Sequence, residues 1–224
     1  LVGSEMCIRD RFRSNQMSLH PNKTKFTVFH HNPNSIPWDD IKIVFDDNNE
    51  ESNIIDNDLI HELSYVNHLS KTPAIRFLGV YFDPGLNFKF HISQINAKLS
   101  RALFNLRRSK NLLSTDALKS LYYSTFHCHL IHGIQIYSCV CDNALKEIIT
   151  KQKMAVRCIA NKKYNAHSGP IFKELNILPF ESLVNYFNLK FMFEYKNNLA
   201  PRSFYNTWST RGDRNFHYCL LYTS

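Results

Sequence analysis

The sequence predicts an α+β chain in which a small strand-rich segment, residues 12–88, precedes an all-helical segment, residues 89–218. The hydrophobic pattern changes near Lys89, from alternating apolar and polar residues to a spacing of three and four. Residues 12–88 carry six Lys and Arg against ten Asp and Glu, whereas residues 89–218 carry nineteen against seven. This division favours a polyanionic partner for the helical segment. Charge alone fits a merely solvated basic surface about equally well.

Both ends of the sequence are expected to be translated sequencing adapter. Read back into codons, residues 1–11 spell a transposase-type library adapter, and residues 219–224 spell its mosaic end reversed. Agreement at both ends makes chance a poor explanation, so these segments are set apart from the expected fold. The biological sequence then runs from Phe12 to Tyr218 as an internal piece of a longer reading frame.

Three strands are expected in the first segment. Lys25–Phe29 alternates in polarity, Ile41–Phe45 is rich in β-branched residues, and Ile75–Phe82 forms a third apolar run. The stretch from Asp46 to Glu51 is charged and rich in turn-forming residues, which predicts an exposed loop. Residues 54–70 fit no single element.

The second segment begins with two expected helices. The first follows Lys89 and buries one apolar stripe, formed by Ile92, Ile95, Leu99, Ala102, Leu103 and Leu106. The second is capped by Ser114 and runs to about Ile131, and Gly133 breaks or bends it.

Two further long helices are expected, with a short one between them. The third helix follows Asp142 as its N-cap and turns Leu145, Ile148, Ile149, Gln152, Val156 and Ile159 inward. A loop from Tyr164 to Pro170 leads to the short helix. Pro179 opens the fourth long helix, which ends near Asn197.

The composition also limits the cellular setting. No run approaches eighteen uninterrupted apolar residues, so no membrane span is expected. Outside the adapter segments four cysteines remain, and no secretory signal is visible, which indicates reduced, intracellular use. They are Cys128, Cys139, Cys141 and Cys158.

Three blocks occur in a fixed order: Leu19–Phe26, reading LHPNKTKF; Ile75–Asp83, reading IRFLGVYFD; and His91–Ile95, reading HISQI and running on into Lys98 and Arg101. Together they resemble the end of the palm and the start of the thumb in reverse transcriptases of non-LTR (LINE-type) retrotransposons. The similarity covers residues 16–30 and 75–110 and continues more loosely through 111–200. It implies a palm remnant over 12–88 and a helical thumb and post-thumb region over 89–218.

The resemblance also implies roles for particular residues. Lys23, with Lys25 as its substitute, corresponds to a lysine thought to act as general acid on the leaving pyrophosphate. The primer grip, a hairpin that holds the primer's 3′ end, corresponds to Phe77, Leu78, Gly79 and Val80, although the residues alone suggest a buried strand with a bulge. Gly79 lets the backbone approach a sugar-phosphate closely. Contacts to the nucleic-acid backbone are expected from Lys98, Arg101, Arg108, Lys146, Lys153 and Arg157.

Two tempting metal sites are rejected. Val44–Asp47 imitates the aromatic-x-Asp-Asp turn of polymerases, but the family places that turn before the Lys-Thr block and not after it. A solvated acidic loop is the better interpretation of this stretch. The soft ligands from His127 to Cys141 match none of the common zinc spacings. No metal is therefore expected in this chain, whereas the intact parent would use Mg²⁺.

These observations predict a piece of an RNA-directed DNA polymerase of a retroelement. It would hold an RNA template and a DNA primer without being catalytically competent alone, and its parent would act in the cytoplasm and nucleus. A non-enzymatic nucleic-acid-binding helical module, or a degenerate element with no protein function, is the alternative.

Overall fold

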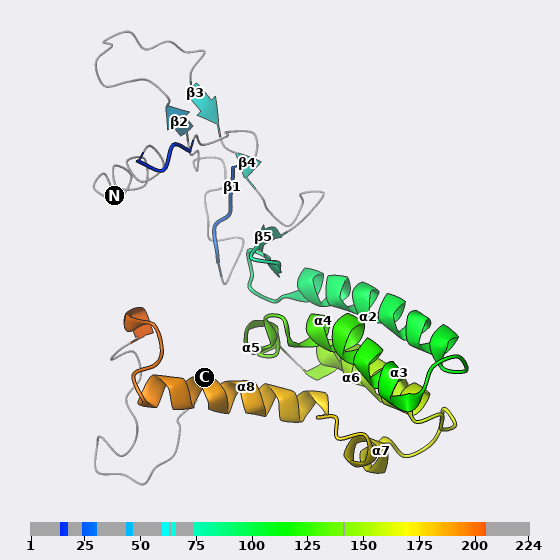
Figure 1. Ribbon diagram of the computed structural model, residues 1–224. Coiled ribbons are helices and arrows are strands. Elements are labelled where there is room, and N and C mark those ends of the chain that lie inside the picture. The colour runs from blue at the N-terminus through cyan, green and yellow to red at the C-terminus, as the bar shows by residue number, and fades with distance from the viewer. Residues whose placement is uncertain are drawn as a thin grey trace, which may run out of the picture. The chain divides into compact units, whose positions relative to one another are not determined.

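A computed structural model describes residues 14–17, 24–30, 44–46, 60–62, 64–65, 74–140 and 142–204 (Figure 1). Residue contacts divide the chain into two units, Leu1–Gln94 and Ile95–Ser224. The division falls inside the first long helix, a little beyond the change of hydrophobic pattern at Lys89. The combination of short strands and long helices confirms the α+β class. Among the described helices, none is both long enough and apolar enough to cross a membrane.

The strands of the first unit form three separate pairs. Strand β1 (Lys25–Phe26) lies parallel to β4 (Ser64–Tyr65), and β2 (Val44–Asp46) lies antiparallel to β3 (Ile60–Glu62). The third pair, β5 and β6, is an antiparallel hairpin with bounds Ile75–Phe77 and Val80–Phe82.

Two strand predictions need correction. The strand expected over Lys25–Phe29 ends at Phe26, and the backbone N–H of His30 donates to the carbonyl of Pro84 at 3.0 Å, outside any strand pair. Strand β2 includes Asp46, which was expected to open the acidic loop, because Asp46 is paired with Ile60. The ambiguous stretch 54–70 contributes β3 and β4, whose pairing depends on partners far away in the sequence.

The second unit is helical. Its elements in chain order, with α2 beginning in the first unit, are α2 (Lys89–Ser109), α3 (Thr115–Tyr122), η5 (Tyr123–His127), α4 (Cys128–Ile131), α5 (Ile134–Tyr137), α6 (Asp142–Ile159), α7 (Ser168–Glu174), α8 (Phe180–Lys196) and η6 (Arg202–Phe204). Helices α3, η5 and α4 follow one another without a break, and α2, α3 and α6 lie side by side (Figure 1).

The second expected helix begins and ends as predicted but contains a π-helical segment. The Ser114 side chain accepts a hydrogen bond from the backbone N–H of Ala117 at 3.3 Å, which caps α3. Within η5 the backbone N–H of Cys128 donates to the carbonyl of Tyr123, five residues earlier. Gly133 then adopts a φ of 70°, a conformation that favours glycine and ends α4.

The predicted boundaries of the later helices hold closely. Helix α8 follows Pro179 and ends at Lys196 with Asn197 as C-cap, as expected. Asp142 is the first residue of α6 instead of the residue before it. The loop expected to reach Pro170 is shorter, because α7 begins at Ser168. Pro170 lies in the first turn, where a missing N–H breaks no helical hydrogen bond.

The apolar stripes predicted for the helices form the core. All six residues of the α2 stripe are buried, as are five of the six in α6, whereas Ile149 is half-buried. Aromatic residues complete the interior: Tyr122 and Phe126 stack with ring centroids 5.2 Å apart, and Tyr137 lies 6.3 Å from Phe180. Burial raises the pKa of both tyrosines, so they stay neutral.

A single buried amide connects three segments of this core. The Gln152 side chain is 1% exposed. Its Nε2 donates to the Tyr122 hydroxyl at 3.1 Å and to the Leu178 carbonyl at 2.9 Å. Its Oε1 accepts from the backbone N–H of Phe180 at 2.8 Å. Helix α6 is thereby tied to α3 and to the start of α8 through groups that are shielded from water.

We expect Gln152→Leu to destabilise the helical unit by about 2–4 kcal/mol. The substitution keeps the size of the side chain, but it leaves the Tyr122 hydroxyl, the Leu178 carbonyl and the Phe180 N–H without this partner. Urea unfolding followed by circular dichroism measures the change. The control is Asn105→Leu, an exposed polar residue on α2, which should change stability by less than about 0.5 kcal/mol. Equal effects of the two substitutions would contradict this prediction.

Candidate nucleic-acid interface

The expected primer-grip residues form the tip of a β-hairpin. The sequence predicted one continuous strand over Ile75–Phe82, and this is wrong: β5 and β6 are joined by a two-residue turn, Leu78–Gly79. Both turn residues have positive φ, 47° and 89°, as a type I′ turn requires. Asn-Gly or Asp-Gly is the usual sequence signal for such a turn, and Leu78–Gly79 lacks this signal.

The four residues of the expected grip differ in exposure. Phe77 is 62% exposed and Leu78 is 79% exposed, whereas Val80 is buried at 5%. Gly79 is half-buried. The hairpin therefore presents an aromatic ring and an aliphatic side chain to solvent, and Val80 holds the hairpin from its inner side.

Contacts at the base of the hairpin hold it in place. The Arg76 guanidinium lies over the Tyr81 ring, 5.9 Å from its centroid, and Tyr81 packs edge-on against Phe90 at 5.2 Å. The backbone N–H of Tyr81 donates to Nδ1 of His91 at 3.3 Å. After β6, the buried carboxylate of Asp83 accepts from the backbone N–H of Asn87 at 2.8 Å. All of these groups belong to the first unit.

Of the two lysines expected to serve as general acid, the structure describes one. Lys23 lies outside the described residues. Lys25, its expected substitute, begins β1 with an exposed side chain and is paired with Ser64 across the parallel strands.

The expected α2 contacts lie on one flank of that helix. Lys98 is half-buried and Arg101 and Arg108 are exposed. The Arg101 Nε donates weakly to the carbonyl of Ala97 at 3.4 Å. The Arg108 guanidinium lies 5.7 Å from the centroid of the exposed Phe104 ring, so a cation and an aromatic face are presented together.

The expected α6 contacts form a second line, spaced by seven and four residues. Lys146 and Lys153 are exposed. Arg157 is half-buried, and its Nε donates to the carbonyl of Ala166 at 2.7 Å, so it also anchors the loop before α7. Among the described residues, none of the six expected contact residues forms an ion pair with a carboxylate.

The expected contact residues on α2 and those on α6 do not form one continuous face. Helix α2 meets α6 through Asn96, whose amide donates to Glu147 at 2.9 Å and whose oxygens accept from Lys151. Arg107 reaches the Met154 sulfur at 3.5 Å on the same flank. By helical spacing, Lys98 and Arg101 lie on another flank of α2 than Asn96 and Arg107, and both act electrostatically on His129 of α4. By helical spacing, Lys146, Lys153 and Arg157 lie on a different flank of α6 from Glu147 and Lys151, which contact α2.

Sequence reasoning missed the cations between α2 and α6. Lys151 bonds to Glu147 at 2.6 Å and to Asn96. Arg107 and Lys110 act on the buried Cys158 thiol: burial raises the pKa of this thiol, and the two cations partly oppose that rise. These residues could not be assigned from one helix alone, because their role depends on which helix α2 packs against.

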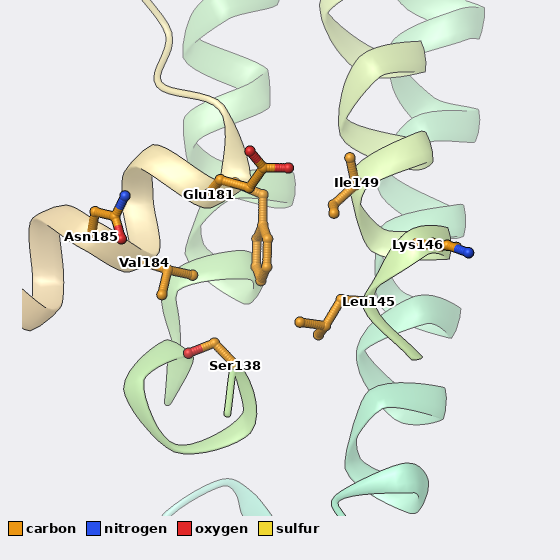
Figure 2. A pocket seen from close by; sticks show the side chains of 8 residues that line it. Ser138, Leu145, Lys146, Ile149, Glu181, Val184 and Asn185 are labelled. Carbon is orange, nitrogen blue, oxygen red and sulfur yellow. The ribbon is translucent and has the colours of Figure 1, made fainter. Parts of the chain in front are cut away.

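A pocket of about 470 Å³ lies beside the α6 line, between the end of α5, α6 and α8. Figure 2 shows Leu145 and Ile149 on one wall, Val184 and Asn185 opposite, and the Lys146 amine pointing away from them. Lys146 is thus one of the residues that line the pocket, while its amine points outward from α6.

The described residues do not assemble a metal centre. Within the described ranges, no group of three or more His, Cys, Asp or Glu side chains could hold a metal ion. Cys128 and Cys139 are exposed free thiols that donate to the carbonyls of Ser124 and Gln135. Asp47 and Cys141 lie outside the described residues.

Comparison with protein-family models, with curated proteins and with solved structures gives no match for this chain.

We expect Leu78→Asn to stabilise the β5–β6 hairpin. Asparagine tolerates the left-handed conformation that costs a leucine about 1–2 kcal/mol, so hydrogen exchange of the Val80 amide should slow about fivefold or more. Mass spectrometry or NMR of the full chain measures the exchange. Leu78→Ala removes most of the same exposed apolar surface without this tolerance and should give no slowing. Identical exchange in the two variants would contradict the expectation.

Proposed function

We propose that the chain is a fragment of a retroelement reverse transcriptase whose helical unit binds the sugar-phosphate backbone of a template–primer duplex. The observation that carries the proposal is the set of cations on α2 and α6 that no described carboxylate neutralises. They stand on helices held rigidly by buried hydrogen bonds, so they keep fixed spacings. The order of the three sequence blocks supports the choice of family.

The charge balance favours nucleic acid over a merely solvated surface. From Ile95 to Phe204 the helical unit carries sixteen Lys and Arg against six Asp and Glu. Two of these acids are engaged with lysines on their own helices, Glu147 with Lys151 and Glu194 with Lys190. A solvated surface would mix both signs more evenly. An excess of fixed cations releases counterions when it meets phosphates.

The positions of the cations favour backbone contacts over the recognition of bases. Lysine and arginine on separate helix flanks can reach phosphates at several points of a duplex, and such contacts position a nucleic acid without specifying sequence. A polymerase requires this property, because its template–primer changes sequence at every step.

The β5–β6 hairpin supports a further part of the proposal, in which Phe77, Leu78, Gly79 and Val80 form a primer grip. Its tip exposes Phe77 and Leu78, which can pack against the terminal sugar and base of a primer. The Arg76–Tyr81 and Tyr81–Phe90 contacts limit movement of the tip. A helical module that binds nucleic acid without belonging to an enzyme would not need this exposed hairpin.

We expect duplex affinity to depend strongly on salt and on Arg101 and Arg108. With roughly four to six phosphate contacts, the slope of log affinity against log salt should be about −3.6 to −5.4. Replacing both arginines by alanine should weaken binding and flatten the slope by about 1.8. Fluorescence anisotropy with a labelled RNA–DNA hybrid measures both quantities.

The matched control for this experiment removes two charges elsewhere. Lys162 and Lys173 are exposed and lie off the two lines of contact, and their double alanine variant should retain most of the slope. If both double variants flatten the salt slope by the same amount, binding is diffuse. The assignment of phosphate contacts to Arg101 and Arg108 then fails. If the unchanged chain shows no salt-dependent binding, the proposed function itself fails.

The proposal assigns chemistry to the intact parent and not to this chain. Phosphoryl transfer in polymerases depends on metal ions that neutralise the developing charge. The parent's aspartates would hold them, and Lys23 would donate a proton to the leaving pyrophosphate. The 224-residue chain alone should extend no primer on an RNA template with Mg²⁺.

In the parent enzyme we expect Lys23→Ala to slow single-turnover nucleotide addition by roughly 10²–10⁴-fold. Lys23→Arg should slow it as well, because guanidinium holds its proton too tightly to act as an acid. Template–primer affinity should change little in either variant, which rapid-quench kinetics and anisotropy together establish. Lys89→Ala, an exposed lysine at the start of α2, is the control. A rate for Lys23→Ala within about threefold of the parent would exclude the acid role.

A further inference from the structure

The loop between α6 and α7 presents a tyrosine and two lysines to solvent. Tyr164 is 90% exposed, the highest value among the large apolar and aromatic side chains that the structure describes. Lys162 and Lys163 precede it directly and are exposed as well. We call residues 161–166 the basic-aromatic loop. It lies entirely within the helical unit.

Hydrogen bonds at the end of α6 fix where this loop begins. The backbone N–H of Lys162 donates to the carbonyl of Arg157 at 3.0 Å, and that of Asn161 donates to the carbonyl of Cys158 at 3.2 Å. Asn161 has a φ of 50°, in the left-handed region. Together these features make a Schellman motif, which ends a helix and sets the direction of the chain after it. The backbone of Lys162 is therefore held against the last turn of α6.

A turn at the tip of the loop places the Tyr164 side chain. The backbone N–H of Ala166 donates to the carbonyl of Lys163 at 3.0 Å. Residues 163–166 consequently form a β-turn with Tyr164 and Asn165 at its centre. The tyrosine ring thus stands on a closed turn instead of an open stretch of chain.

Arg157 joins the two ends of the loop. Its carbonyl accepts from Lys162, and its Nε donates to the carbonyl of Ala166 at 2.7 Å. The shape of the loop is therefore set before any ligand arrives. Binding to such a loop orders little additional chain, so it costs less conformational entropy.

The charge around the loop indicates the kind of ligand. From Ile148 to Lys173 the chain contains six Lys and Arg and no Asp or Glu. Among the described residues, no carboxylate forms an ion pair with either lysine of the loop. Arg107 of α2 reaches the Met154 sulfur at 3.5 Å, so a further cation lies beside the last turns of α6. An exposed ring among such cations suits a nucleic-acid base for stacking, with phosphates next to it.

We propose that the basic-aromatic loop binds one unpaired nucleotide of a single strand, with the base stacked on the Tyr164 ring and the neighbouring phosphates against Lys162 and Lys163. The identification of this strand as the one that continues beyond the template–primer duplex rests on the proposed function. Every base has a face that can stack, so the loop holds the strand without reading its sequence. Arg157 acts here as a positioning residue, because it fixes the loop that carries Tyr164.

The test compares two labelled RNA–DNA hybrids by fluorescence anisotropy with the full chain at fixed salt. One hybrid is blunt, and the other carries a short single-stranded extension of its RNA strand. The chain should bind the extended hybrid more tightly by about fivefold or more, since one stacked base contributes at least this much. Tyr164→Ala should remove most of this preference and leave the affinity for the blunt hybrid unchanged. Tyr164→Phe should keep the preference, because stacking needs the ring and not the hydroxyl.

The matched control removes another exposed apolar side chain of the same unit. Leu112 is 83% exposed and lies between α2 and α3, and Leu112→Ala should keep the preference for the extended hybrid. Equal affinity of the unchanged chain for the two hybrids would overturn the proposal. A Tyr164→Ala variant that loses affinity for both hybrids alike would overturn it as well.

An extension made of abasic nucleotides separates stacking from attraction to phosphates. It keeps the phosphates and removes the bases, so the unchanged chain should bind it about as weakly as Tyr164→Ala binds the intact extension. Tyr164→Ala should not distinguish the two extensions, because the partner of the missing base is itself absent. If the unchanged chain binds both extensions equally, the loop recognises phosphates alone and the stacked base is overturned.

Arg157→Lys tests the positioning role. The variant keeps the positive charge but lacks the planar Nε–H that reaches Ala166. Hydrogen exchange of the Ala166 amide should become faster, and the preference for the extended hybrid should fall. Lys153→Arg, at an exposed residue one turn earlier, also keeps its charge and should change neither quantity. A preference that survives in Arg157→Lys despite faster exchange would overturn the positioning role.

The blunt hybrid also distinguishes this inference from the proposed function. Binding of the blunt hybrid without a preference for the extension leaves the proposed function standing and removes the loop site. A preference that depends on Tyr164, with no binding of the blunt hybrid, keeps the loop site and removes the duplex as a ligand of the helical unit.

Discussion

The hydrogen bonds of the Gln152 side chain are the constraint on which the helical unit depends. This amide joins α6 to α3 and to the beginning of α8, and it is shielded from water that could replace a lost partner. A second polar cluster, formed by Asn96, Glu147 and Lys151, joins α2 to α6. Together they fix four helices, α2, α3, α6 and α8, relative to one another. The cations on those helices consequently stand at defined spacings, as the proposed contacts to a repeating phosphate backbone require.

The helices could be predicted from the sequence because their signals are local. Apolar spacing placed the buried face of α2, the hydroxyl of Ser114 placed a cap, and Gly133 placed a break. The strands were less predictable, because pairing between β1 and β4 depends on residues far apart in sequence. The resemblance implied a hairpin at Leu78–Gly79, but the residues alone did not, because a leucine with positive φ carries no turn signal.

The candidate site shows the same division between local and long-range information. Helical period alone placed Lys98, Arg101 and Arg108 on one flank of α2. It could not show that Lys98 and Arg101 act electrostatically on His129, since that depends on how α4 lies relative to α2. The pattern of α6 likewise grouped Arg157 with its lysines, although its contact with Ala166 also holds a loop. Residues whose role depends on two helices therefore escaped a search made one helix at a time.

The placement of carboxylates explains why the cations remain available. Glu147 neutralises Lys151 at the junction of α2 and α6, and there a buried charge would otherwise be costly. Among the described residues, no carboxylate forms an ion pair with Lys98 or Arg101. Glu147 thus stabilises the contact between α2 and α6, whereas the exposed cations on other flanks of these two helices stay available for the proposed contacts to phosphates.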